Sequence, residues 1–294
     1  MRTIATFYRF TPFVDPKPLG AQLQRLGREW GIKGTLLLAH EGINGTIAGT
    51  RPAVGALLAH IRGVPGCDGL EWTESTAEHC PFGRLKVKIK PEIVSLGQDT
   101  ANPRIAVGEY VAPEQWNALL RAPDVVAIDT RNSYEVAIGS FAGAVNPQIA
   151  RFRDFPRWWQ ANAPRFAGKR VAMFCTGGIR CEKSTSYALA QGAAEVYHLK
   201  GGILRYLQAI PADHSLWRGS CFTFDGRVSL DHGLRRGPHI LCYGCRHPIL
   251  PSDSLRPEYE PGVSCHHCLH KTGAAHKARR RERQQQMELA RARC

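Results

Sequence analysis

Hydrophobic residues in the first hundred positions follow the spacings of strands and helices in turn. Runs rich in β-branched, aromatic and leucine residues predict three strands, over 3–8, 32–40 and 43–49. Apolar residues recur at helical spacing over 19–30, and again over 54–61 behind the capping residue Thr50. These patterns predict two helices, the first between the first and second strands and the second after the third strand.

A fourth strand is predicted over residues 85–89, where apolar residues alternate with Lys86 and Lys88, and Lys90 continues the row. The resulting order of strand, helix, two strands, helix and strand is typical of a small ferredoxin-like α+β domain, which we expect over residues 1–98. A row of lysines usually only solubilises the outer face of a strand. Contact with RNA is the alternative interpretation.

Strands and helices alternate again from residue 121 to residue 220. Strands are predicted over 125–129, 170–174 and 195–199, and helices around 151–161 and from about residue 181. Such alternation predicts an α/β domain with a parallel sheet covered by helices on both faces. Residues 99–120 contain Asn102-Pro103 and Ala112-Pro113, and we expect them to form a connector between the two domains.

The predicted strand 170–174 leads directly into Cys175 and a glycine-containing loop before the next helix. Turns from strand to helix at the carboxyl edge of a parallel sheet are where α/β proteins build their sites. The glycines allow successive N–H groups to point inward, and the helix dipole and Arg180 add positive potential. A thiol in such a loop is expected to lose its proton near neutral pH. The catalytic candidates are therefore Cys175 and Arg180, with an active-site loop of Thr176, Gly177, Gly178 and Ile179.

The roles of the two cysteines in this loop stay open. Cys175 could be a buried structural cysteine that precedes a glycine-rich turn. Cys181 could be packed against the core, or it could be a resolving thiol that forms a reversible bond with Cys175.

Four of the ten cysteines occur as two close pairs, Cys242-x2-Cys245 and Cys265-x2-Cys268. Four thiolates complete a tetrahedral shell around zinc and leave no open position, so a structural zinc ion is predicted. The surrounding segment, 221–273, is rich in Pro, Gly, Cys and His and lacks a periodic apolar pattern, so metal binding would supply its folding energy. Disulfides and an iron–sulfur cluster are the alternatives.

Composition and charge narrow the class of protein. The 294 residues are 43% hydrophobic, and no apolar run approaches the roughly 20 residues of a membrane span. The first residues lack the pattern of a secretory signal, so we expect a cytoplasmic protein without membrane contact. The formal net charge is +14, which favours a polyanionic partner, and a basic tail is predicted over 274–294. That tail is either a solvated segment or a further contact with nucleic acid.

The loop and its neighbours resemble the rhodanese family, whose active loop begins with cysteine, ends with arginine five residues later and precedes a helix. Further matches are Asp129-Thr-Arg131, Glu135, Gly139–Asn146 and the glycine turn Leu199–Ile203. The resemblance implies that Cys175 carries a persulfide and that Asp129, Arg131 and Cys181 support the site. This chain has Ser140-Phe141 where many rhodaneses have His-Ile, and Cys181 where serine is common.

Four stretches together resemble the tRNA uridine(34) hydroxylase family: Gly42–Thr46, Phe174–Lys183, His198–Ile203 and Cys221–Val228. The order of the domains agrees with that family up to about residue 273. The resemblance implies an enzyme that converts the wobble uridine of tRNA to 5-hydroxyuridine in an oxygen-dependent reaction, with the rhodanese cysteine essential. Its partners would be the anticodon region of tRNA and dioxygen.

Two other functions remain open: a sulfurtransferase that passes persulfide sulfur to tRNA or a protein, and a non-enzymatic, zinc-bearing RNA-binding redox sensor. The redox cofactor is unknown, because neither a dinucleotide fingerprint nor a set of two histidines and one carboxylate can be assigned. Zinc held by four thiolates has no redox chemistry. One hypothesis is that the Cys175 thiolate or persulfide adds to C6 of uracil, which makes C5 electron-rich enough to react with oxygen.

Overall fold

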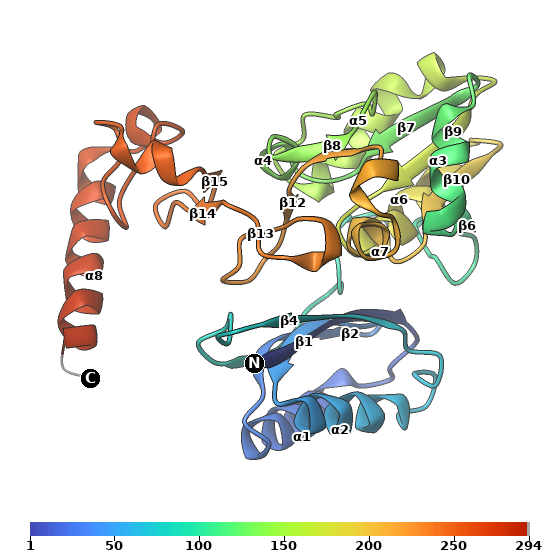
Figure 1. Cartoon of the computed structure of the whole chain (residues 1–294). Helices are drawn as coiled ribbons and strands as arrows, with labels where there is room; N and C mark the ends of the chain where they lie inside the picture. Colours follow the sequence, from blue (N-terminus) through green and yellow to red (C-terminus); the bar gives the residue numbers. More distant parts are fainter. Residues whose placement is uncertain (293–294) are drawn as a thin grey trace. The chain divides into compact units, whose positions relative to one another are not determined.

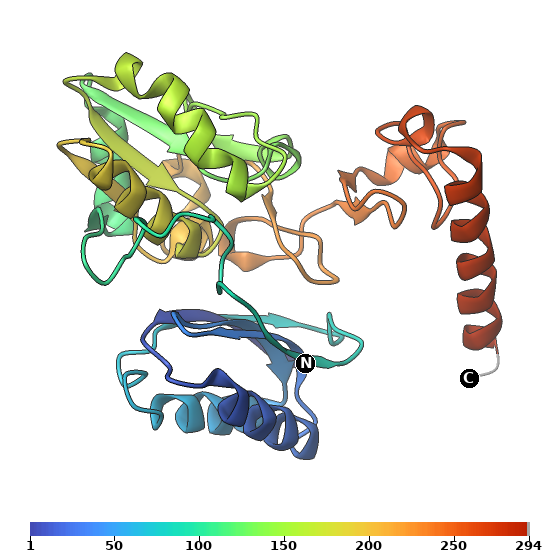
Figure 2. The same cartoon turned by 180° about the vertical axis from the view of Figure 1, so that it is seen from behind.

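The computed structural model describes residues 1–292, so Arg293 and Cys294 of the predicted basic tail lie outside the described residues. The chain forms two units (Figures 1 and 2). The first comprises Met1–Cys221 and Asp231–Arg235, and the second comprises Phe222–Leu230 and the chain from Arg236 onward. None of the described helices is long and apolar enough to cross a membrane.

The N-terminal domain is a five-stranded sheet with two helices against one face (Figure 1). Its strands are β1 (Arg2–Phe10), β2 (Lys33–Ala39), β3 (Gly42–Gly49), β4 (Trp72–Ala77) and β5 (Leu85–Ile89), in the order β4-β1-β3-β2-β5. The helices are α1 (Pro16–Glu29) and α2 (Arg51–Arg62). Thr50 accepts a hydrogen bond from the Ala53 N–H at the start of α2, as its capping role predicts.

The N-terminal sheet contains a strand, β4, that the sequence does not predict. β4 pairs antiparallel with β1, whereas the predicted strand β5 lies at the opposite edge, parallel to β2. β4 has no apolar alternation, because it is an edge strand with nearly all of its residues half-buried. The prediction of a strand over 85–89 is confirmed, but it is the fifth strand of the domain rather than the fourth, because β4 is not predicted.

The second domain has a parallel four-stranded sheet in the order β6-β10-β9-β7. These strands are β6 (Glu109–Val111), β7 (Val125–Asp129), β9 (Arg170–Phe174) and β10 (Val196–Leu199). Its helices are α3 (Pro113–Arg121), α4 (Ser133–Val136), α5 (Phe155–Asn162), α6 (Ile179–Ala190) and α7 (Gly202–Ala209). The short strands β8 (Gly139–Phe141) and β11 (Trp217–Gly219) pair beside the sheet. The predicted α/β class is confirmed.

Two local predictions for this domain need correction. Residues 99–120, expected as a connector, contain β6 and most of α3, and β6 adds an edge strand to the parallel sheet. These elements are short, and Glu109 and Tyr110 are exposed, so periodicity does not identify them. The helix predicted over 151–161 is split into a 3-10 turn, Phe152–Asp154, and α5, which begins just before Pro156.

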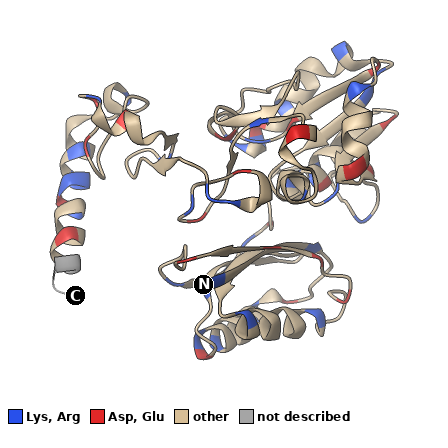
Figure 3. Ribbon diagram, in the orientation of Figure 1, with Lys and Arg blue, Asp and Glu red and all other residues tan. Residues whose placement is uncertain are grey.

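The second unit contains little regular structure before its last helix. Short strands are β12 (Cys221–Phe222), which starts in the first unit, β13 (Ser229–Leu230), β14 (Ile240–Leu241) and β15 (Pro248–Ile249). The remaining 3-10 turns of the chain are Ala163–Phe166, Ala212–His214, His232–Leu234, Pro251–Leu255 and Leu269–Lys271. α8 (Ala274–Ala292) carries recurring basic residues (Figure 3) and is tied to this unit by an ion pair between Arg281 and Glu260.

Candidate active site and metal site

Cys175 lies at the end of β9, at the start of the loop that leads into α6. The loop turns at Gly178, whose φ of +97° is a backbone conformation that favours glycine. α6 begins at Ile179, so Arg180 and Cys181 lie in its first turn rather than before it. Cys175 is fully buried, while Thr176, Gly177 and Ile179 are half-buried.

The surroundings of the Cys175 sulfur favour its ionised form. The Gly178 N–H donates to Sγ at 3.2 Å. Burial disfavours the thiolate, but a hydrogen bond from the Cys181 thiol, the charge of Arg180 and the N–H groups of Cys181 and Arg180 outweigh burial. Together they lower the pKa of Cys175 from 9.0 to about 6. The predicted nest of N–H groups is present in the structure.

The surroundings of the Cys181 sulfur favour its neutral thiol form. Burial and the neighbouring Cys175 sulfur keep the pKa of Cys181 well above its usual value. Its sulfur also lies 3.8 Å from the Thr130 hydroxyl. In the reduced protein Cys181 is therefore a neutral thiol that donates to the Cys175 thiolate.

The ionisation of Cys175 gives a testable pH dependence. Because its pKa is lowered, the thiolate should form as the pH rises through about 6 and should be complete near neutrality. In Cys181→Ala the lost hydrogen bond should move this midpoint to higher pH. The Cβ chemical shift of 13C-labelled Cys175 would report the titration without requiring access to the buried sulfur. A wild-type midpoint near the pKa of free cysteine would contradict the proposed stabilisation.

Arg180 is held beside the loop by Glu135. Its Nη1 and Nη2 atoms donate to the two carboxylate oxygens of Glu135 at 2.5 and 3.0 Å, and Nη2 lies 3.2 Å from the Thr176 hydroxyl. The ion pair is buried, since the Glu135 side chain has no exposed surface. The guanidinium is thus fixed at the side of the loop, from which its charge reaches Cys175.

Asp129 and Arg131 form a second buried ion pair beneath the loop. Nε and Nη2 of Arg131 donate to the two carboxylate oxygens of Asp129 at 2.8 and 2.6 Å. Arg131 also donates to the Gly139 carbonyl, and the Ser140 hydroxyl donates to Asp129. The serine that replaces the histidine of many rhodaneses therefore belongs to this network. Both charged side chains are fully buried and bind each other.

The start of α7 holds the carbonyl groups of the active-site loop. The Ile203 N–H donates to the Cys175 carbonyl at 2.9 Å, and the Leu204 N–H donates to the Thr176 carbonyl at 3.0 Å. Gly202 has φ +67°, and a Cβ there would lie 2.6 Å from both of these oxygens and from the Gly178 nitrogen. The glycine turn predicted from the sequence is required for this close approach.

Gly202→Ala should therefore displace the loop as well as strain the backbone. We expect a loss of stability of about 2–4 kcal/mol, from a left-handed conformation plus overpacking, together with a weakened Cys175 thiolate. Gly192→Ala is the matched control, because Gly192 has φ +88° but nothing within 4 Å of an added Cβ. Urea unfolding of both variants would separate the two costs, and equal losses would contradict the packing argument.

The N-terminal domain contributes a tyrosine to this site. The Tyr8 hydroxyl on β1 donates to Glu182 at 2.8 Å, and the Tyr110 hydroxyl donates to the same carboxylate at 2.8 Å. Glu182 is buried on α6, and burial raises its pKa. A Cβ at Gly178 would lie 2.9 Å from the Tyr8 hydroxyl, so Tyr8 lies directly over the loop.

Ion pairs fix the two domains of the first unit to each other on either side of Tyr8. Lys183 on α6 is buried and pairs with Glu41 at 2.8 Å and with Glu92 at 2.5 Å. Lys200 and Arg205 pair with Glu71, next to β4. The Lys183 contacts join the helix after Cys175 to the hairpin at Gly42. Both segments belong to the stretches that resemble the family in the sequence.

A third cysteine, Cys221, lies near the loop although its spacing from the other cysteines shows no pattern. Cys221 is fully buried and hydrogen-bonds with the Thr176 side chain. Burial raises its pKa to about 12, and the charges of Glu135 and Asp129 act in the same direction, whereas Arg131 opposes them. Cys221 is therefore a neutral thiol in the native protein.

The four paired cysteines of the second unit come together as predicted. Their sulfur atoms all lie within 4.8 Å of one another, and Cys245 and Cys265 are 3.8 Å apart. Thiolates at ~2.3 Å from one ion in a tetrahedron are about 3.8 Å apart, so the set fits a four-coordinate metal. The sequence neighbours of these cysteines include several histidines, but no histidine belongs to this cluster of described residues.

Comparison with known proteins identifies the family. Residues 2–93 match the UPF0176 acylphosphatase-like domain, and residues 112–209 match the rhodanese-like domain. The tRNA uridine(34) hydroxylase of Ruegeria pomeroyi is 63% identical over 293 residues, which cover 100% of this chain and 97% of that protein. The protein of the same name from Roseobacter denitrificans is 57% identical and is covered to 99%. The chain belongs to the tRNA uridine(34) hydroxylase family.

Another tRNA uridine(34) hydroxylase, from Caulobacter vibrioides, is 52% identical over 97% of this chain and 92% of its own length. The resemblance stated from the sequence is thus confirmed, as is the assignment to a family of enzymes. The rhodanese-like match contains the Cys175 loop, the two buried ion pairs and the glycine turn.

In this member of the tRNA uridine(34) hydroxylase family, the loop residues, Cys181, Asp129 and Arg131 lie together in the candidate active site. The four cysteines that are positioned to hold a metal ion lie in the second unit. Sequence reasoning missed four residues of the first site: Tyr8, Tyr110, Glu182 and Cys221. Glu182 and Cys221 lie in stretches that resemble the family, which is a signal for them. Tyr8 and Tyr110 carry no local signal, because only tertiary structure brings them to α6.

Proposed function

We propose that this chain hydroxylates uridine 34 of tRNA to 5-hydroxyuridine, with dioxygen as co-substrate and Cys175 as the nucleophile. The observation that carries the proposal is the buried Cys175 thiolate in the loop between β9 and α6, in a chain that is similar to tRNA uridine(34) hydroxylases over its whole length. The loop N–H groups and Arg180 would stabilise the sulfur anion before and after it reacts. Because Cys175 has no exposed surface, the base enters when the side chains above the loop, including Tyr8, move apart.

The thiolate acts on the electron-poor C6 atom of uracil. Sγ forms a bond to C6, and the electron pair of the C5=C6 double bond moves to C5 and O4 as an enolate. C5 thereby becomes the nucleophile that accepts oxygen. Loss of the C5 proton and departure of the Cys175 thiolate from C6 then restore the double bond and free the product.

The overall reaction needs an external reductant. One oxygen atom of dioxygen enters the C5–H bond and the other leaves as water, which consumes two electrons and two protons. A dithiol that is oxidised to a disulfide would supply both. In this proposal the Cys175 thiolate supplies the nucleophile, and the neutral Cys181 thiol beside it stabilises the anion.

Sulfur transfer is a second candidate function. The same nest of N–H groups that favours a thiolate would favour the anionic terminal sulfur of a Cys175 persulfide. Transfer to uridine would replace an oxygen atom, which leaves as water, with sulfur. An external dithiol that is oxidised to a disulfide would supply the two electrons and two protons that this exchange needs, and the cysteine would return to its thiolate form.

For the metal site we propose zinc. Four cysteine thiolates form a closed shell that suits this ion, and such a site contributes to folding rather than to catalysis. Cys242 and Cys245 would bind from the turn after β14, and Cys265 and Cys268 from the turn before α8.

The test is mass spectrometry of nucleosides from unmodified tRNA incubated with the purified protein and a dithiol under heavy-isotope dioxygen. The isotope matters because adding an oxygen atom and exchanging oxygen for sulfur change the nominal mass by nearly the same amount. Labelled 5-hydroxyuridine at position 34 is the expected result. An unlabelled thiouridine that requires a sulfur donor would move the assignment to sulfur transfer, and no product in either assay would leave the redox-sensor interpretation.

A further inference from the structure

The face of the N-terminal sheet that α1 and α2 leave uncovered carries two rows of side chains across four strands. Strand register places in one row Thr6, Thr46, Thr35 and Lys86, and in the next row Tyr8, Asn44, Leu37 and Lys88. The residues between them point to the helices, since Leu36, Leu38, Leu85 and Val87 belong to or pack against the core of this domain. The two rows are therefore one continuous, mostly polar surface.

One end of this surface lies against the active-site loop. The Tyr8 hydroxyl lies over Gly178 and binds Glu182, as described above. A Cβ at Gly177 would lie 3.8 Å from Cγ2 of Thr6. The β1 end of both rows thus touches the residues that follow Cys175.

The other end of the surface is positively charged. Lys86 and Lys88 on β5, and Arg84 just before it, are exposed. In the part of the chain that the structure describes, no ion pair includes any of the three. Three strand spacings separate β5 from β1, a distance of about 14 Å.

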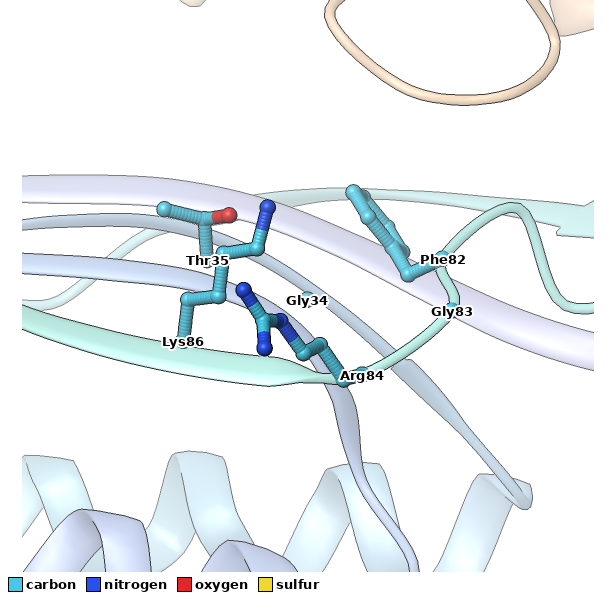
Figure 4. Close-up of a pocket in the computed structure, with 6 residues that line it drawn as sticks. All are labelled: Gly34, Thr35, Phe82, Gly83, Arg84 and Lys86. Carbon is cyan, nitrogen blue, oxygen red and sulfur yellow. The ribbon is translucent and has the colours of Figure 1, made fainter. Parts of the chain in front are cut away.

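A hollow with an aromatic wall adjoins these cations. It is lined by Gly34, Thr35, Phe82, Gly83, Arg84 and Lys86. Figure 4 shows Thr35, Phe82 and the end of Lys86 rising from the sheet on the side opposite to the helices, with the Arg84 guanidinium beside the Lys86 side chain. A half-buried ring beside two cations offers a stacking surface next to phosphate partners.

We propose that this sheet face binds the single-stranded nucleotides next to the target uridine of tRNA. Arg84, Lys86 and Lys88 contact their phosphates, and Phe82 stacks on one unpaired base. This inference rests on the proposed function, because it takes tRNA as the substrate. It adds a binding surface in the N-terminal domain that leads the strand toward Cys175.

The dimensions and chemistry of the surface favour single-stranded nucleotides as its ligand. The four-stranded sheets of RNA-recognition domains stack two or three unpaired bases, and the two rows described here also cross four strands. A loop exposes its bases for stacking, whereas a duplex does not. Neutralisation of phosphates by lysine and arginine releases counterions, which makes such binding depend on salt. The same face contacts the loop at one end and carries the cations at the other, so a strand bound along it would lead toward Cys175.

The test compares two double variants of the full-length, zinc-loaded protein. Lys86→Gln/Lys88→Gln removes two charges from the proposed surface, and Lys17→Gln/Arg25→Gln removes two exposed charges from α1 on the opposite side of the sheet. Binding of unmodified tRNA is measured by fluorescence anisotropy from about 50 to 200 mM salt. The first variant should lower the slope of log K against log salt by about 1.4, which corresponds to two single-strand phosphate contacts. The control should keep the wild-type slope.

Phe82→Leu provides an independent measurement. It should weaken tRNA binding about fivefold or more without changing the salt slope, because it removes stacking but no charge. Product formation is measured in the same protein preparations, so that binding and chemistry are separated.

A salt slope that is equal in the two double variants would overturn the proposed surface, and so would a wild-type protein that does not bind tRNA. A lysine-dependent slope with no 5-hydroxyuridine would support the surface and reject the hydroxylase function. Product formation with a salt slope that the lysine substitutions leave unchanged would support the hydroxylase function and reject the surface.

Discussion

Replacing Cys175 with serine should abolish formation of 5-hydroxyuridine, with a fall in rate of about 10³-fold or more. The serine hydroxyl would meet the same N–H donors at Gly178, Arg180 and Cys181, but it would stay protonated at neutral pH, whereas the native thiol has a pKa of about 6. Without an anion at this position, no bond to C6 of uracil can form, and C5 stays unreactive. Mass spectrometry of nucleosides after incubation with unmodified tRNA would measure the loss.

Cys80→Ser is the matched control for this variant, since Cys80 is half-buried in the N-terminal domain and far in sequence from the loop. It should retain wild-type product formation. Cys175→Ser should still bind tRNA with the wild-type salt dependence, because the proposed binding surface lies on the N-terminal sheet. Unchanged product formation by Cys175→Ser would reject a nucleophilic role for this residue.

Most of the fold can be predicted where apolar periodicity is strong. The strands and helices of residues 2–62 are examples, because their apolar periodicity reflects a buried face. The parallel strands β7, β9 and β10 are recognised differently, as short runs of mostly apolar residues. β4 and β6 are edge strands with exposed or half-exposed residues, so burial leaves no period for the sequence to show. Because neither strand is predicted, β5 is expected as the fourth strand of the first domain, and residues 99–120 are expected to form a connector.

The candidate site also has a part that the sequence predicts and a part that it does not. Cys175 to Cys181 are contiguous, and their chemistry follows from a strand, two glycines and a helix start, all of which are visible in the sequence. The partners that complete the site come from other elements. Tyr8 lies 174 positions from Glu182 and Tyr110 lies 72 positions away, so only the packing of β1 and β6 against α6 reveals their hydrogen bonds.

Removal of the metal should unfold the second unit while leaving the first unit intact. The buried cluster that contains Cys242, Cys265 and Cys268 has few other apolar members, so the four thiolates account for most of the cohesion of this segment. A structural zinc ion contributes about 10–16 kcal/mol to folding in comparable sites, more than such a small core can supply. Cys265→Ser, or a chelator, should therefore remove protection from hydrogen exchange over residues 240–271.

The first unit provides its own control in the same experiment. All six tryptophans of the chain lie in it, at positions 30, 72, 116, 158, 159 and 217. Tryptophan fluorescence should therefore report an unchanged urea transition in Cys265→Ser, while metal analysis shows the loss of one zinc ion per chain. Protection over 240–271 that survives complete removal of the metal would contradict a structural role. Because the second unit, which holds the metal site, does not contain the Cys175 loop, the Cys175 titration should also persist near pH 6 after chelation. A shifted titration would mean that the metal supports the active site as well as its own fold.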